Sequence, residues 1–136
     1  MLRKIKFVQS YGVLSKSVLE HVEQLYSLEL KVGILFSSVE AMDFMDRLLW
    51  TNKQLSFIPH ATDKDIDLDL QPIYLTTCPE FPNFPNVLVC VDCVSNKIVC
   101  KEEIIIFPSD SKSLESIRRY YKDIQSFSNE VSFTKE

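Results

Sequence analysis

Two strand-then-helix units follow one another in the first 50 residues, and this order constrains the fold more than any other feature. The segment KIKFVQ alternates apolar and polar side chains, whereas KVGILFS is a continuous apolar run typical of a strand covered on both faces. A segment with helical periodicity follows each run. Successive units of this kind favour a mostly parallel sheet with right-handed crossover connections.

Candidate capping residues mark the start of both expected helices. Ser17, with Glu20 three residues on, fits a capping box for the first helix. Either Ser38 or Ser37 can cap the second, the latter with Glu40 at the matching position. The expected inward faces consist of Val18, Val22, Leu25 and Tyr26 in the first helix and Met42, Met45, Leu48 and Leu49 in the second.

The second half of the chain is rich in expected strands: PIYLTT, NVLVCVD, KIVC and EEIIIFP. A last helix is expected within SKSLESIRRYYKDIQSF, followed by a polar tail at about 128–136. We therefore expect a single α/β domain over residues 1–136. Its predicted architecture is a three-layer sandwich with a mostly parallel sheet of about five strands.

Charge and hydropathy exclude several classes of protein. The formal net charge is -4, which disfavours direct binding of nucleic acid, so we expect contact with DNA only through a partner. No apolar run approaches the roughly 20 residues that span a membrane. The N-terminal MLRKIKFVQS lacks the features of a signal peptide. These observations favour a cytoplasmic protein whose four cysteines are reduced thiols.

Nucleotide chemistry is disfavoured because the chain has two glycines, Gly12 and Gly33. Phosphate-binding loops need glycines that let backbone amides approach the ligand, and neither G-x-x-x-x-G-K nor G-x-G-x-x-G is present. We therefore expect no phosphate-binding loop and no cofactor. A small nucleotide- or thiol-dependent enzyme remains the alternative to a binding protein.

Metal binding and thiol chemistry are suggested by CVDC, in which Cys90 and Cys93 have C-x-x-C spacing. A structural zinc site needs a second close pair, whereas Cys78 and Cys100 stand alone. If the strand continued, alternation would also place Cys90 and Cys93 on opposite faces. A thioredoxin-type motif would have to open a helix. The pattern favours buried structural thiols and no metal.

The acidic loop DKDIDLDL has aspartates at every second position, as at the start of a calcium-binding loop. Neither possible register supplies the required glycine and glutamate, so we expect a solvated loop or an edge strand.

The two histidines offer no recognisable catalytic set: His21 is expected on the surface, and His60 is expected to contact a loop backbone.

Two groups of residues are candidates for binding. On the last helix Arg118, Tyr121 and Lys122 stand at positions i, i+3 and i+4, with Arg119 adding charge. They form either a solvated flank with Tyr121 in the core or a socket for an acidic peptide. In LLWTNKQLSFIPH, the only tryptophan, Trp50, precedes Phe57 by seven residues. These rings could belong to the core, to the wall of an active site or to a docking surface.

The segment LLWTNKQLSFIPH resembles the L-W…S-F-[IV]-P-H signature of the chi subunit of bacterial DNA polymerase III. EIIIFP…IRRYYK likewise resembles that family's strand-proline segment and its A-R-x-R-Y-[KR] helix. The resemblance covers essentially the whole chain. It implies a Rossmann-like fold without a phosphate loop and a non-catalytic accessory subunit of a holoenzyme that has DNA polymerase activity.

The resemblance also implies two partners. One is the acidic C-terminal tail of single-stranded DNA-binding protein, which carries aspartates and ends in a phenylalanine carboxylate. By motif, Arg118 and Lys122 would hold its carboxylates, Tyr121 would line the pocket for the terminal ring, and Arg119 would add charge.

The second implied partner is the clamp-loader psi subunit or an equivalent protein. Phe57 would be its exposed anchor, with Trp50 either in the same patch or packed beneath it, while Pro59 and His60 shape the turn. The following loop, 61–71, lacks the glycines that many family members have there.

Overall fold

A computed structural model describes residues 3–51, 59–62, 65, 71–125 and 129–136. The elements in chain order are β1 (Lys4–Ser10), α1 (Leu14–Ser27), β2 (Val32–Phe36), α2 (Val39–Thr51), β3 (His60–Ala61), β4 (Ile73–Thr76), β5 (Val87–Val91), β6 (Glu102–Pro108), α3 (Leu114–Gln125) and β7 (Glu130–Lys135).

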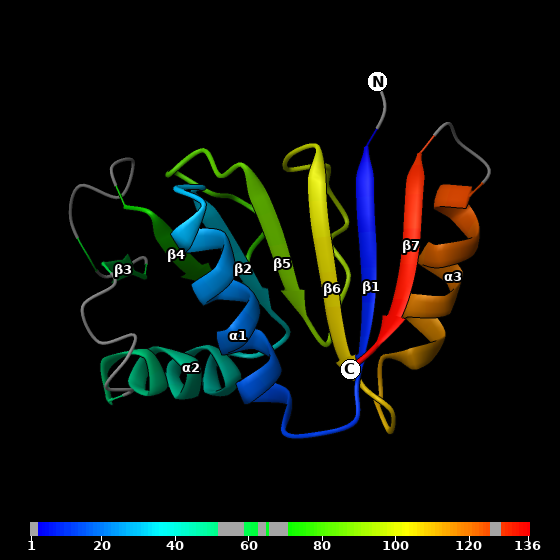
Figure 1. The fold of residues 1–136 in the computed structure, drawn as a ribbon, viewed down its shortest axis with the longest axis horizontal. Coiled ribbons are helices and arrows are strands. Elements are labelled where there is room, and N and C mark those ends of the chain that lie inside the picture. The colour runs from blue at the N-terminus through cyan, green and yellow to red at the C-terminus, as the bar shows by residue number, and fades with distance from the viewer. Residues whose placement is uncertain (1–2, 52–58, 63–64, 66–70, 126–128) are drawn as a thin grey trace.

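The strands form one sheet in the order β3-β4-β2-β5-β6-β1-β7, and every pair is parallel. The predicted α/β class and parallel sheet are confirmed, although the sheet formed by the described residues has seven strands where about five were expected. In Figure 1, β3 lies at one edge of the sheet, whereas β7 lies at the other edge beside α3.

The sheet divides the core into two layers of side chains. Alternate residues of each central strand point to opposite faces, as Val89 and Leu88 of β5 illustrate. One face packs against α1 and α2 through residues such as Val22 and Met45. The other packs against α3 through Ile117 and Ile124. The result is the predicted three-layer sandwich.

The C-terminal segment differs from the prediction, because residues expected to be a polar tail form β7. This strand pairs with β1 and has no partner on its outer side among the described residues. An edge strand needs few apolar residues, since much of its surface faces water. That is why its composition resembled that of a tail.

The predicted strand KIVC is also wrong. Both sides of β5 are already paired, with β2 and β6, so no position beside it is open to a further strand. Residues in this connection instead cover the sheet as irregular chain, and Val99 and Cys100 pack onto the core on the α3 side.

The helix starts confirm one capping prediction and correct another. The backbone N–H of Ala41 donates a 3.2 Å hydrogen bond to Ser38 Oγ, so Ser38 caps α2. By contrast, α1 starts at Leu14 after Val13, whose side chain makes no capping bond. Ser17 lies inside the helix, and the predicted capping box there is wrong.

The two histidines are both buried, which corrects the expectation of a surface position for His21. His21 Nδ1 donates to the carbonyl of Ser17 at 2.9 Å, and its Nε2 lies 3.6 Å from Glu136 Oε2 at the end of the sheet. His60 belongs to β3, where it is in register with Ile73 of β4.

Most of the acidic loop, which was expected to be a solvated loop or an edge strand, lies outside the described residues. Within the described ranges, the backbone N–H of Thr62 donates to Asp65 Oδ2 at 2.9 Å.

No helix in the described part of the chain is long and apolar enough to cross a membrane.

Candidate functional site

The candidate site is built on α3, whose sequence separates an apolar face from a cationic one. Ile117 and Ile124 are buried against the sheet, whereas Arg118 and Lys122 are exposed. Glu115 in the first turn and Lys122 in the last turn also match the polarity of the helix dipole. The helix therefore presents two positive charges, those of Arg118 and Lys122, on one side.

A buried ionic contact holds α3 against the sheet. The hydroxyl of Tyr120 donates a 3.1 Å hydrogen bond to Glu103 Oε2 on β6, and Arg3 Nη2 donates to the same oxygen at 2.6 Å. Burial raises the pKa of Glu103, whereas Arg3 and Tyr120 act to lower it. Burial likewise raises the pKa of Tyr120 to about 12, so its hydroxyl remains a hydrogen-bond donor at neutral pH.

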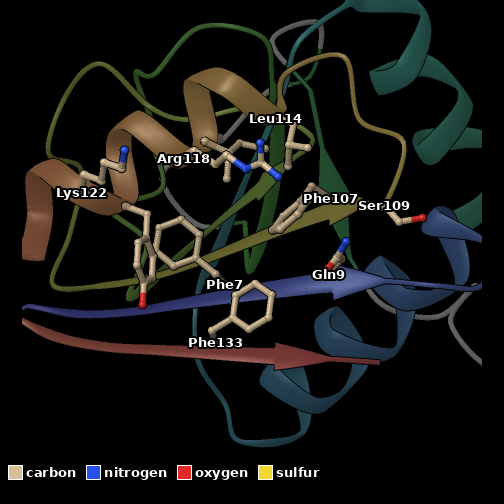
Figure 2. A pocket seen from close by; sticks show the side chains of 10 residues that line it. Phe7, Gln9, Phe107, Ser109, Leu114, Arg118, Lys122 and Phe133 are labelled. Carbon is tan, nitrogen blue, oxygen red and sulfur yellow. The ribbon is translucent and has the colours of Figure 1, made fainter.

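A groove of about 440 Å³ lies between α3 and the sheet. Its lining comes from β1, β6, α3, β7 and the connection after β6: Phe7, Gln9, Phe107, Ser109, Leu114, Ile117, Arg118, Tyr121, Lys122 and Phe133. Figure 2 shows Arg118 and Lys122 extending from the helix on one side, with the rings of Phe7 and Phe133 on the strands opposite.

Aromatic rings form much of the groove's floor. Phe7 and Tyr121 meet edge to face, with 5.1 Å between ring centroids and an angle of 75° between planes. Phe133 is the parallel partner of Phe7 in the register of β7 and β1, which places the two side chains next to each other on one face. Phe133 lines the groove and is 45% exposed.

The positive charges beside this floor are not neutralised from within the chain. Neither Arg118 nor Lys122 forms an ion pair with any residue that the structure describes. Arg119 differs, because it does not line the groove and its Nη2 lies 3.6 Å from Glu115 Oε1. The groove thus combines two available cations with an apolar floor.

Three of the predicted residues, Arg118, Tyr121 and Lys122, are therefore brought together in one groove, whereas Arg119 lies outside it. Sequence reasoning missed Phe7 and Phe133, which come from strands far apart in the chain. Helical spacing gives no signal for them, because their proximity depends on the pairing of β7 with β1.

A second surface surrounds Trp50 at the end of α2. Its side chain is 58% exposed, which excludes a core position. The ring lies 4.4 Å from that of His60, and His60 Nε2 is 3.4 Å from Asp46 Oδ1. A buried histidine thus supports an aromatic ring that faces solvent. Phe57, the other predicted anchor, lies outside the described residues.

Two of the cysteines, Cys90 and Cys100, lie in surroundings that disfavour thiol chemistry. Asp92 has a φ of 53°, and this left-handed residue ends β5 so that Cys93 turns back toward Cys90 on the α3 side of the sheet. A hydrogen bond with Cys93, together with burial, raises the pKa of Cys90 well above its ordinary value. Burial raises that of Cys100 to about 11. High pKa values disfavour the thiolate, which is the form needed for nucleophilic attack or metal binding.

Metal binding also finds little support in the geometry. In the ranges that the structure describes, no group of three or more histidine, cysteine, aspartate or glutamate side chains is arranged to hold an ion. The groove on α3 remains the candidate site, and its composition suits a peptide with carboxylates and an apolar side chain.

Two comparisons with known proteins match most of the chain and indicate the same family. The sequence model of the family described as DNA polymerase III chi subunit, HolC, matches residues 2–131. The protein described as probable DNA polymerase III subunit chi from Rickettsia prowazekii (strain Madrid E) is 29% identical over 125 residues. That alignment covers 87% of this chain and 67% of the relative.

Proposed function

The chain belongs to the DNA polymerase III chi subunit family, accessory subunits of the replicative holoenzyme, and we propose that it links this holoenzyme to single-stranded DNA-binding protein. In this proposal the groove on α3 binds the acidic C-terminal tail of that protein. The subunit has no catalytic activity of its own, contacts DNA only through its partner and works in the cytoplasm.

One observation carries the proposal: two cations without ion-pair partners among the described residues stand beside an aromatic floor. Arg118 and Lys122 are one turn apart on α3, so they can reach successive carboxylates of an extended acidic peptide. The ring of Tyr121, which packs against the buried ring of Phe7, offers a place for the peptide's terminal aromatic side chain. Arg119 adds charge from outside the groove and contributes less.

The surface around Trp50 is the proposed docking site for the clamp-loader psi subunit or an equivalent protein. An exposed tryptophan that is held in place by a buried neighbour suits an interface anchor, because little side-chain freedom is lost when a partner binds. Phe57 is proposed as a second anchor from its motif alone.

The alternative, a nucleotide- or thiol-dependent enzyme, has less support. The connection from β1 to α1 contains a single glycine, Gly12, which is too few for a phosphate cradle. The raised pKa values of Cys90 and Cys100 oppose thiol chemistry.

The direct test is a calorimetric titration with an acidic peptide that ends in Asp-Asp-Ile-Pro-Phe. We expect saturable binding that weakens as salt is added, because the ligand's carboxylates are held by exposed cations. The same peptide without its last residue serves as the control and should lose most of the affinity. Equal binding of the two peptides, or no binding of either, would contradict the proposal.

A further inference from the structure

We propose that Phe133 on β7 determines the specificity of the groove by favouring an aromatic over an aliphatic side chain at the apolar end of the bound peptide. This inference rests on the proposed function of the groove and adds to it a residue outside the predicted set on α3. It also gives a role to the C-terminal strand.

The position of Phe133 follows from strand pairing. Residues of β7 alternate between the two faces of the sheet, and Val131, two positions earlier, packs into the core on the α3 side. Phe133 therefore lies on the same side, next to Phe7 and facing α3 (Figure 2). Unlike Phe7, which is 1% exposed, Phe133 is 45% exposed and has ring surface available to a ligand.

The strand that carries Phe133 is fixed at both ends. At its start, Asn129 Nδ2 donates a 3.1 Å hydrogen bond to the carbonyl of Ile124 near the end of α3. At its finish, the backbone N–H of Glu136 donates to the Gln9 carbonyl at 2.9 Å, and the N–H of Tyr11 donates to the Glu136 carbonyl at 2.8 Å. The distance between Phe133 and α3 is thus set by the fold before a ligand arrives.

The arrangement of rings explains why an aromatic ligand would be favoured. Tyr121 and Phe7 already use edge-to-face geometry, and Phe133 extends this floor toward the open side of the groove. A ligand ring can pack against these faces and edges with the favourable quadrupole contacts that an aliphatic chain lacks. Each such contact corresponds to roughly a twofold to tenfold change in affinity.

The experiment measures two peptides against a set of variants by calorimetry. One peptide ends in phenylalanine and the other, otherwise identical, ends in leucine. For Phe133→Leu we expect affinity for the first peptide to fall by roughly twofold to tenfold, with less than a twofold change for the second. The preference for phenylalanine should therefore shrink, whereas Phe133→Tyr, which keeps the ring, should retain it.

Ser132→Ala is the matched control, because Ser132 is on the same strand but does not line the groove. Circular dichroism and thermal melting show whether each variant remains folded. If Phe133→Leu weakens both peptides equally, or neither, the inference is overturned while the groove's proposed function stands. If the unmodified protein binds neither peptide, the proposed function itself fails, and the inference fails with it.

Discussion

The hydroxyl of Tyr120 on α3 donates a 3.1 Å hydrogen bond to the buried carboxyl group of Glu103 on β6. Arg3, just before β1, forms an ion pair with the same carboxyl group at 2.6 Å. The contact joins the helix that carries the groove's cations to β6 and to the residue just before β1. The position of α3 beside the groove therefore depends on a polar cluster that does not line the groove.

This cluster predicts a pH-dependent effect for Arg3→Met. Burial raises the pKa of Glu103, so its contribution to stability is fully present below its ordinary value of 4.5 and is lost as the pH rises through the folded-state value. Without Arg3 the pKa of Glu103 rises further. The substitution should cost little free energy of unfolding at pH 4 and about 3 kcal/mol at pH 7.5. Urea unfolding at the two pH values measures the difference, and an equal cost at both would refute this account.

Removal of the groove's cations should weaken peptide binding without affecting the fold. For Arg118→Ala and for Lys122→Ala we expect a loss of about 1.5 kcal/mol each, or roughly tenfold in affinity, that shrinks at high salt. Arg119→Ala is the matched control, because Arg119 lies outside the groove and pairs with Glu115. Calorimetric titration of all three variants provides the comparison. Equal losses for Arg118 and Arg119 would mean that general charge, and not the groove, attracts the peptide.

The packing of Phe81 on Gly33 predicts a stability effect at a distance from the groove. A Cβ atom added to Gly33 would lie 2.5 Å from Cδ1 of the Phe81 ring, so Gly33→Ala should destabilise the fold by about 1–3 kcal/mol. Gly12→Ala is the control, since a Cβ there meets nothing within 4 Å. Chemical denaturation measures both changes. Similar stability of the two variants would show that Phe81 can move aside.

Trp50 allows the proposed second surface to be tested both by mutation and by tryptophan fluorescence. We expect Trp50→Ala to reduce affinity for the psi subunit by about 2 kcal/mol, because exposed aromatic anchors dominate interface energetics. Phe44→Ala on the same helix is the control. Phe44 is 50% exposed, and the aromatic ring that packs against His60 is that of Trp50. Trp50 is the only tryptophan, so its fluorescence should shift to shorter wavelength when the partner covers it. An unchanged spectrum in the bound state would place the interface elsewhere.

The sequence predicted the central elements well because their apolar periodicity is strong. The runs that became β2 and β5 are buried throughout, and such segments have few alternatives in a small domain. β7 was missed for the opposite reason. Its residues are half-buried or exposed, and its strand character comes from pairing with β1.

The same contrast applies to the candidate site. The spacing of Arg118, Tyr121 and Lys122 on one helix is a local property, so the sequence alone places these residues together. The aromatic floor requires Phe7 and Phe133 to meet across 126 positions of sequence, a consequence of strand order that no local pattern contains. Strand β7 and the strand side of the groove were therefore not predicted for the same reason, namely that both depend on the pairing of β7 with β1.

The most direct test of the central claim is an NMR titration of the isotopically labelled protein with the acidic peptide that ends in phenylalanine. We predict that backbone amide shifts concentrate on α3, β1 and β7, with the largest changes near Tyr121 and Phe133, and that signals of α2 around Trp50 remain unchanged. Shifts centred on α2, or no shifts at millimolar peptide, would contradict the claim that this groove receives the tail.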